Sequence, residues 1–443
     1  MEHDLVPPAA PPRATRRRIA ERRIAPRLIG GALLASAAVS ATALPAIAQT
    51  PPAAPAPAHA HASQLPPEQG WAYTRYELLA PGSGAFRIVY DVTATRPGAR
   101  YFFNPIRKGS VSSDETVIDL ATGRPLAFAI VHGADAKGPD FPDADPTYDY
   151  IRVTLARPVP TEGGGARLRI LKTYTDARSY FTDGADLVFR RDLGITRNAV
   201  VLPKGYGLMS CTYPSQVAQE ADGRLRISFL NDTPAEAPLE LRAAPINLGP
   251  GSALSRPEER AAQSRDIVYF LEAPESHAFR LYHDYTETRE GVDRYINVVR
   301  TGSAASDPRA FDLDTGEPLA ARILKGPEIA AAGIVEEGLD PAAPGAEAVV
   351  FSFPRIAPGG SLRLRMWETY ADPKSYRLEG DELVFDRTFG RSDNAVVLPA
   401  GWRLTSSLSP AVIRQLPDGR TRLDFLNPRD DEVEVRITAQ KVK

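Results

Sequence analysis

Residues 198–203, Asn-Ala-Val-Val-Leu-Pro, recur without change as residues 394–399. Around this run, residues 173–210 align with residues 369–406 without a gap, and 20 of the 38 aligned positions are identical. A self-match of this length predicts a folded body in which one structural unit occurs twice. We name residues 71–245 repeat 1 and residues 265–443 repeat 2. Residues 246–264 form the joint, where we expect a loop and one short helix.

Both repeats alternate polar and apolar side chains with a period of two, as in Arg167-Leu168-Arg169-Ile170 and Arg363-Leu364-Arg365-Met366. This pattern is typical of strands with one buried face. Asp222-Gly223 and Asp418-Gly419 supply the positive φ angles of tight hairpins. The sequence therefore predicts an all-β fold of two tandem, homologous, antiparallel β-sandwich-like domains. We expect two separate cores formed by Leu187, Phe189, Val200, Leu202 and Phe229, and by Leu383, Phe385, Val396, Leu398 and Phe425.

Four polar residues belong to the repeated blocks: Arg191, Asn198, Arg387 and Asn394. Each asparagine opens an apolar strand that a proline ends, since proline cannot donate to a strand ladder. We interpret all four as structural signature residues. The asparagines would hydrogen-bond the local backbone. The arginines would pair with an acid or cover apolar surface.

The first 48 residues have the pattern of an export signal. Seven arginines precede the apolar stretch of residues 28–44, and Ala46-Ile47-Ala48 is a small-x-small cleavage site. We expect cleavage after Ala48, a Pro/Ala-rich linker over residues 49–70, and a periplasmic or secreted protein. A retained anchor is the alternative. Residues 15–19 resemble a twin-arginine motif, so the Sec and Tat routes both stay open.

Charge and cysteine content restrict the partners. The 443 residues carry a net charge of −2. Residues 1–48 hold seven arginines and three acids, so the chain after Ala48 is at about −6. No basic run remains in it, which makes nucleic acid a poor partner. Cys211 is the one cysteine, so no internal disulfide forms.

Known catalytic patterns are missing from the sequence. It has no His-Glu-x-x-His, no Gly-x-Ser-x-Gly and no phosphate-binding glycine loop before a helix. His277 and His283 would share one face of a strand, but no third metal ligand accompanies them. We therefore predict no catalytic residues and no cofactor, although a pair of carboxylates acting on a glycan remains an alternative.

The repeats differ most in two loops, residues 133–165 and 326–360. The first loop holds five aspartates, of which Asp143 and Asp145 could offer oxygen ligands to calcium. A solvated acidic loop is the simpler interpretation. Ligands often bind between domains. We therefore expect the largest pocket to be lined by both repeats, with part of the loop from Asp140 to Asp149 at its rim.

The repeated blocks Thr-Tyr-x-Asp, Leu-Val-Phe and Asn-Ala-Val-Val-Leu-Pro resemble those of uncharacterised exported bacterial proteins with duplicated β-domains. The Asp-x-x-Thr-Gly turns at Asp119 and Asp312 are loosely similar to the N-terminal β-domain of M1- and M61-type aminopeptidases. The catalytic helix motif of those enzymes is absent from this sequence. The resemblance thus implies a non-catalytic, substrate-orienting or docking module.

Duplicated structural residues and missing catalytic patterns favour an exported, non-enzymatic module that binds or scaffolds. Its partner would be an envelope protein, a peptide or a glycan. The alternative is a carboxylate-dependent hydrolase that acts on glycans, with its site between the two repeats.

Overall fold

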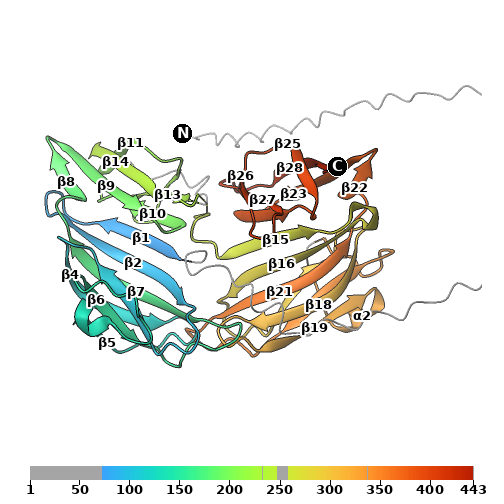
Figure 1. Cartoon of the computed structure of the whole chain (residues 1–443), viewed down its shortest axis with the longest axis horizontal. Coiled ribbons are helices and arrows are strands. Elements are labelled where there is room, and N and C mark those ends of the chain that lie inside the picture. The colour runs from blue at the N-terminus through green and yellow to red at the C-terminus, as the bar shows by residue number, and fades with distance from the viewer. Residues whose placement is uncertain (1–71, 232, 247–257, 337, 443) are drawn as a thin grey trace, which may run out of the picture. The chain divides into compact units, whose positions relative to one another are not determined.

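The computed structural model describes residues 72–231, 233–246, 258–336 and 338–442. These residues form an all-β protein, as predicted (Figure 1). Within the described ranges no helix has the length and apolar character needed to cross a membrane. The predicted signal, the whole linker and most of the joint lie outside the described residues. Residues 258–264 of the joint form turns rather than the expected helix.

Repeat 1 folds into three sheets. The long sheet has the order β12-β13-β10-β1-β2-β7-β4, and a four-stranded sheet has the order β11-β14-β9-β8. A small third sheet has the order β3-β6-β5, and it stands apart from β4, whose isolated bridge from Ile118 reaches Pro125, three residues before β5. The elements of repeat 1 are β1 (Tyr73–Leu78), β2 (Ala85–Ala94), β3 (Tyr101–Ile106), β4 (Val111–Asp119), β5 (Phe128–His132), α1 (Gly133–Ala136), β6 (Asp149–Thr154), β7 (Ala166–Thr175), β8 (Tyr180–Asp183), β9 (Asp186–Leu193), β10 (Arg197–Val201), β11 (Tyr206–Cys211), β12 (Gln216–Gln219), β13 (Leu225–Leu230) and β14 (Ala237–Pro245).

Repeat 2 folds into two sheets. The long sheet has the order β17-β20-β19-β18-β21-β16-β15-β24-β27-β26, and the four-stranded sheet has the order β22-β23-β28-β25. The long sheet is continuous because β18 and β19 pair with each other. The elements of repeat 2 are β15 (Arg265–Leu271), a 3-10 helix (Pro274–Ser276), β16 (Ala278–Glu287), β17 (Arg294–Val298), β18 (Ala304–Asp312), β19 (Pro318–Lys325), α2 (Pro327–Ala331), β20 (Glu347–Ser352), β21 (Leu362–Ala371), β22 (Tyr376–Glu379), β23 (Glu382–Phe389), β24 (Asp393–Val397), β25 (Trp402–Ser407), β26 (Val412–Gln415), β27 (Thr421–Leu426) and β28 (Val433–Lys441).

The first strand of each repeat departs from the expected antiparallel arrangement. β1 runs parallel to β10, and β15 runs parallel to β24. Each first strand lies between its hairpin partner and a strand that follows more than a hundred residues later, and it runs in the same direction as that later strand. The pairing registers correspond, because Thr74 faces Asn198 in repeat 1 and Ile267 faces Asn394 in repeat 2.

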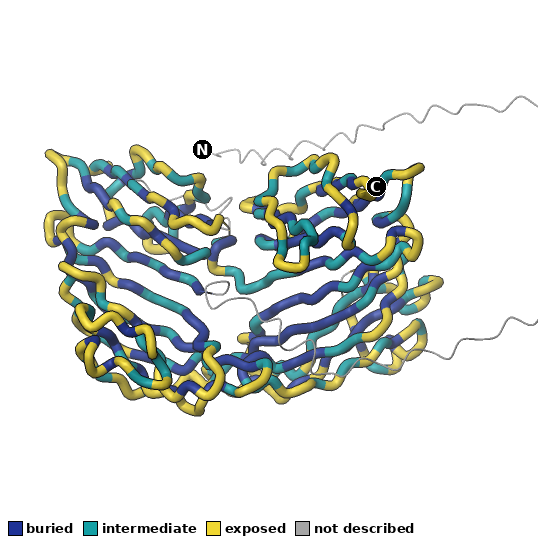
Figure 2. Tube along the Cα trace, in the orientation of Figure 1, coloured by how far each residue is buried: buried dark blue, intermediate teal, exposed yellow. Residues whose placement is uncertain are grey.

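Each repeat has its own main core between its long sheet and its four-stranded sheet, as predicted. Alternating apolar residues of the two sheets form each core. Figure 2 shows that buried residues follow the strands, whereas exposed residues gather in the loops. Phe229 belongs to the core of repeat 1 and Phe425 to the core of repeat 2. All ten predicted core residues are buried, and the two sets lie in different cores.

Two turns that correspond in sequence join the repeats reciprocally. The turn after β4 touches residues 359–361 of repeat 2, where the Ser361 N–H donates to Ala121 O at 3.2 Å. The turn after β18 touches residues 162–165 of repeat 1, where the Gly165 N–H donates to Leu313 O at 2.8 Å. Gly123 (φ 71°) and Gly316 (φ 77°) sit in these turns, and a Cβ at either would clash with a carbonyl oxygen of the other repeat.

Candidate functional site between the repeats

A cavity of about 630 Å³ lies where the two repeats and the joint meet. It is lined by residues of β1, β2, β7 and β10 of repeat 1, by residues of β15, β16 and β21 of repeat 2, and by residues of the joint. The expected position of a cavity between the repeats is therefore confirmed. Seven charged residues line it: Arg167, Arg169, Arg197, Arg265, Arg363, Asp91 and Glu258.

Arg167 forms a buried ion pair across the two repeats. Its Nε lies 2.5 Å from Asp314 Oδ1 and its Nη2 lies 2.7 Å from Asp314 Oδ2. Nη2 also donates to Ser361 O at 3.1 Å. Burial lowers the pKa of Arg167, but the adjacent Asp314 outweighs this effect and raises the pKa above its ordinary value. The guanidinium group is therefore charged, and it holds β7 of repeat 1 against the β18 turn of repeat 2.

Asp266 of repeat 2 accepts hydrogen bonds from arginines of both repeats. Arg197 donates a hydrogen bond from Nη2 to Asp266 Oδ1, and Arg363 Nη2 lies 3.2 Å from Asp266 Oδ2. Arg197 Nη2 also lies 3.4 Å from Asp393 Oδ2. Neither Asp266 nor Asp393 lines the cavity, and Asp314 does not line it either. These aspartates lie behind the cavity wall, and each neutralises an arginine that lines it.

Arg265 differs from the other cavity arginines. It forms no ion pair with any residue in the described ranges, and its guanidinium carbon lies 4.6 Å from the centroid of the Tyr285 ring. Arg169, in contrast, donates to both oxygens of Asp91, at 2.6 and 2.8 Å. The cavity wall thus offers one half-buried cation without a carboxylate partner, and this cation suits an anionic ligand.

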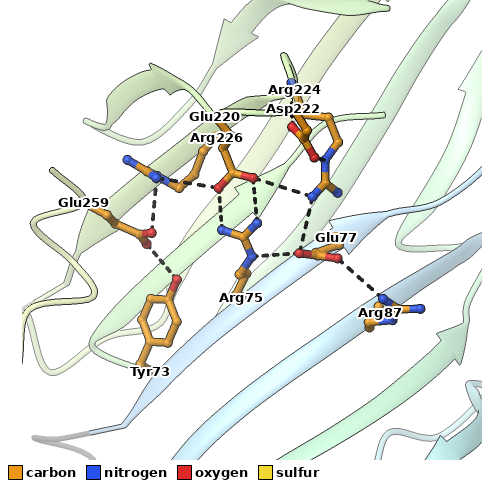
Figure 3. Close-up of polar contacts among 9 residues, drawn as sticks. All are labelled: Tyr73, Arg75, Glu77, Arg87, Glu220, Asp222, Arg224, Arg226 and Glu259. Carbon is orange, nitrogen blue, oxygen red and sulfur yellow. Dashed lines mark hydrogen bonds and ion pairs between the residues drawn. The ribbon is translucent and has the colours of Figure 1, made fainter. Parts of the chain in front are cut away.

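A polar network fastens the joint to repeat 1 beside the cavity (Figure 3). Tyr73 Oη donates to Glu259 Oε1 at 2.7 Å, and Arg226 Nε lies 3.3 Å from Glu259 Oε2. Arg75 extends the network by donating to both oxygens of Glu220, at 2.6 and 2.8 Å. Burial, followed by the adjacent Glu259, raises the pKa of Tyr73 well above its ordinary value. Tyr73 is therefore a neutral donor that belongs to both the network and the cavity wall.

Asp143 and Asp145 are exposed. Asp145 Oδ1 accepts hydrogen bonds from the N–H and the hydroxyl of Thr147, at 2.8 and 2.5 Å, and these bonds lower the pKa of Asp145. Across the described ranges, no three His, Cys, Asp or Glu side chains lie close enough together to hold a metal ion. Calcium binding at Asp143 and Asp145 stays a prediction.

The expected place of the acidic loop at the cavity rim is wrong, because none of residues 140–149 lines the cavity. The loop folds instead over the small sheet of repeat 1. Phe141 stacks on Phe103 with ring centroids 5.1 Å apart, and it meets Tyr150 edge-on at 5.2 Å. Asp140 Oδ2 accepts the backbone N–H of Tyr101 at 3.1 Å. Leaving the apolar side chains of this sheet exposed to water would cost free energy, which explains why the loop packs over them.

The four signature residues have corresponding contacts in the two repeats. Each arginine lies near an aspartate of its own repeat, and each asparagine donates its side-chain N–H to a backbone carbonyl three residues earlier. The contacts are Arg191–Asp176 (3.7 Å), Arg387–Asp372 (2.8 Å), Asn198–Ile195 O (2.5 Å) and Asn394–Arg391 O (2.9 Å).

The sequence did not identify the cavity arginines. Arg167 and Arg363 occupy polar positions of alternating strands, which in a single domain would face water. Both are buried, because that face of each long sheet meets the other repeat. The available signal was the recurrence of Arg-Leu-Arg at the same place in both repeats, since a purely solvated position rarely needs one residue type twice.

No protein-family model matches the chain, and no curated protein matches its sequence. Among solved structures, an M1 zinc metallopeptidase from Deinococcus radiodurans is 13% identical over 39% of this chain and 41% of its own, with a TM-score of 0.28. A mutant of that enzyme is 13% identical over 43% and 50%, with a TM-score of 0.27. The collagen adhesin from S. aureus is 6% identical over 71% and 83%, with a TM-score of 0.16. This chain thus spans at most half of either metallopeptidase chain.

Proposed function

We propose that the protein is an exported, non-enzymatic binding or scaffolding module that holds an acidic peptide segment of an envelope protein between its two repeats. The observation that carries this proposal is the cavity wall. Asp314, Asp266 and Asp393 neutralise arginines from outside the lining, whereas Arg265 has no carboxylate partner in the described part of the chain. A glutamate or aspartate side chain of a peptide would supply that partner.

Two tyrosines favour a peptide over a glycan. A sugar ring stacks on an open aromatic face, but Arg265 covers the ring of Tyr285. The hydroxyl of Tyr73 is engaged by Glu259. The hydroxyls of Thr286 and Ser361 are engaged too, because Thr286 accepts from Arg363 at 2.9 Å and Ser361 donates to Leu120 O at 2.6 Å. The wall therefore offers few free hydroxyl groups to a sugar.

The hydrolase alternative would have to use the acids that line the cavity, Asp91 and Glu258. A glycosidase needs one carboxyl group that keeps its proton until the leaving group takes it. Both oxygens of Asp91 are engaged, because they accept hydrogen bonds from Arg169. Glu258 Oε2 accepts from the Gln263 side chain at 3.0 Å. Both acids are thus held by neighbouring side chains of the protein, so binding is the better supported role.

The experiment measures fluorescence anisotropy of a labelled glutamate octapeptide with the chain that begins at Gln49. A glutamine octapeptide of equal length is the matched ligand control. We expect salt-sensitive binding of the acidic peptide, at least about tenfold weaker binding of the neutral one, and a similar loss in Arg265→Glu. Arg403→Glu, at an exposed position of β25, is the control variant and should retain the wild-type affinity.

Two results would overturn the proposal. One is equal binding of both peptides, or of the acidic peptide by wild type and Arg265→Glu. The other is hydrolysis of an envelope glycan that is lost in Asp91→Asn or Glu258→Gln, which would establish the hydrolase alternative instead.

A further inference from the structure

A second cavity, of about 280 Å³, lies inside repeat 2. It opens between the long sheet and the four-stranded sheet, and residues of β15, β16, β17, β21, β23 and β24 line it. We name it the His283 cavity. Its volume is several times the roughly 30 Å³ that one water molecule occupies in the liquid, and it is close to the lower end of small-molecule sites. The cavity shares no lining residue with the cavity between the repeats.

Three buried polar atoms of this lining lack a hydrogen-bond partner among the described residues. They are Nε2 of His283, Oδ1 of Asn394 and Nε of Arg387. The exposed fractions of these residues are 4%, 1% and 8%. A buried polar atom without a partner costs free energy, and a ligand that supplies the partner recovers it. The cavity therefore offers a donor at Arg387, an acceptor at Asn394 and an imidazole nitrogen at His283.

The charges around the cavity favour an anion. Burial, and then the nearby Arg391, lower the pKa of His283 well below its ordinary value, so the imidazole is neutral at pH 7. Arg391 lines the cavity and forms no ion pair within the described ranges. Arg387 is neutralised by Asp372 through a different nitrogen, Nη1, which leaves its Nε–H directed elsewhere. The lining also holds one acid, the exposed Glu432, and a second arginine, Arg300, which donates to Thr388 O at 3.2 Å and forms no ion pair within the described ranges. Two arginines therefore face one acid, and Arg391 and Arg300 are the cations available to a bound carboxylate.

Apolar side chains line much of the rest of the cavity. Ile267, Leu281, Val298 and Phe389 belong to the lining, and they would contact an aliphatic substituent of a ligand. A ligand that satisfies every group named here has a carboxylate, a hydrogen-bond donor near it and a short apolar chain.

Repeat 1 has different residues at the two decisive places. His283 faces Ile267 in the β15–β16 register, and Tyr90 faces Thr74 in the corresponding β1–β2 register. In the aligned blocks, Ile195 stands where repeat 2 has Arg391. Asn198 keeps an unpartnered Oδ1, as Asn394 does, so the asparagine alone does not distinguish the repeats. Repeat 2 therefore combines the imidazole of His283 with the guanidinium of Arg391, and repeat 1 has neither group at the corresponding places.

We propose that the His283 cavity binds a small carboxylic acid that carries a neighbouring hydroxyl or amino group. Its carboxylate accepts hydrogen bonds from Arg391 and from Nε of Arg387, and its hydroxyl or amino group donates to Oδ1 of Asn394. Nε2 of His283 bonds to whichever of these ligand groups reaches it. This site is independent of the peptide binding proposed above, and either can fail without the other.

The test uses saturation-transfer NMR and calorimetry at pH 7 on the chain that begins at Gln49. The probes are 2-hydroxy-4-methylpentanoate and leucine. The controls are 4-methylpentanoate, which lacks the donor, and 4-methylpentanamide, which lacks the carboxylate. We expect at least one of the two probes to bind, and each control to bind about tenfold more weakly or not at all.

The decisive variants introduce the residues of repeat 1: His283→Tyr and Arg391→Ile. Both should weaken probe binding by at least about tenfold, while Arg403→Ile should leave it unchanged. Arg391 is half-buried, so this variant decides the matter if His283→Tyr fails to fold. Absence of binding by both probes at millimolar concentration, or full affinity in Arg391→Ile, would overturn the proposal.

Discussion

Lys172 and Glu368 stand at the same place in the two repeats, where one is a basic residue and the other an acidic residue. Lys172 lies on β7 and Glu368 on β21, each one residue before a Thr-Tyr pair of the repeated block. Lys172 Nζ donates to Oδ1 of Asn104, and Glu368 accepts from Nδ2 of Asn297, with both carboxyl oxygens at 2.9 Å. Both charged residues are buried. An asparagine beside each can meet either charge, because an amide is both donor and acceptor.

The Lys172 site predicts a rise in stability at alkaline pH. Burial, and then Arg191, lower the pKa of Lys172 to about 7 in the folded protein. Between pH 7 and the unfolded pKa of about 10.4, the unfolded chain holds more protons, so stability rises with pH. Below pH 7 both states are protonated, and the burial cost is fully present. We expect wild type to gain about 3–4 kcal/mol relative to Lys172→Met between pH 7 and 10 in urea titrations. Parallel pH profiles of the two proteins would contradict this.

Glu368→Gln tests the opposite pH dependence, a stability that falls as pH rises. Burial raises the pKa of Glu368, so the folded state keeps a proton that the unfolded chain loses near its ordinary pKa. Stability that depends on this group therefore falls as pH rises from about 4.3 through the folded-state pKa. The variant should show a smaller fall over that window in the same titrations. An identical fall would show that Glu368 titrates normally.

Breaking the Arg167–Asp314 pair should destabilise the protein strongly. Either Arg167→Met or Asp314→Leu leaves one buried charge without its partner, which costs about 3–5 kcal/mol. The double variant removes both charges and should recover most of that loss. Denaturant unfolding of the four proteins gives the coupling energy directly. Additive losses in the double variant would mean that the two side chains do not depend on each other.

Phe229→Ala and Phe425→Ala test whether the two cores are equivalent. Each phenylalanine faces the signature asparagine of its own repeat across the strand pair and is buried. Each truncation should lower the free energy of unfolding by about 3–5 kcal/mol. Ile413→Ala, at a side chain that is 52% exposed, is the control and should change stability by less than about 0.5 kcal/mol. A loss below about 1 kcal/mol in either phenylalanine variant would contradict the packing of that core.

Export predicts a defined new N-terminus. We expect cleavage after Ala48, so mass spectrometry of the exported protein should find Gln49 as its first residue. Retention of residues 28–44 in the exported protein would identify that stretch as an anchor instead. Replacing Arg16 and Arg17 together with lysine should block export if the Tat route is used and leave it intact if Sec is used.

Calcium should raise the melting temperature if Asp143 and Asp145 bind it, because a ligand specific to the folded state stabilises by mass action. The matched comparison is Asp143→Asn combined with Asp145→Asn, which should abolish the shift. Thr147 already occupies Oδ1 of Asp145, so any calcium ion must use the remaining carboxylate oxygens. Unchanged melting in millimolar calcium would leave these residues as solvated surface.

The sequence predicted the β architecture and the core residues because strands with one buried face leave a period of two, and because the pattern occurs twice. Phe189 and Phe385 could be assigned to cores from alternation alone. The parallel β1–β10 and β15–β24 pairs could not be predicted, since local pattern does not reveal which distant strand a first strand joins. Arg167 looked like a solvent-facing residue because an alternating strand does not show whether its polar face meets water or another repeat.

Arg197 and Asp393 occupy corresponding positions and face each other across the contact between the repeats, with Nη2 and Oδ2 3.4 Å apart. In a symmetric dimer of identical halves, a residue at such a place meets its own copy. Two copies of the first half would bring arginine against arginine, and two copies of the second would bring aspartate against aspartate. Because one chain carries both halves, the charges can be complementary. The same asymmetry disfavours any contact between two molecules that would bring two copies of the same half together.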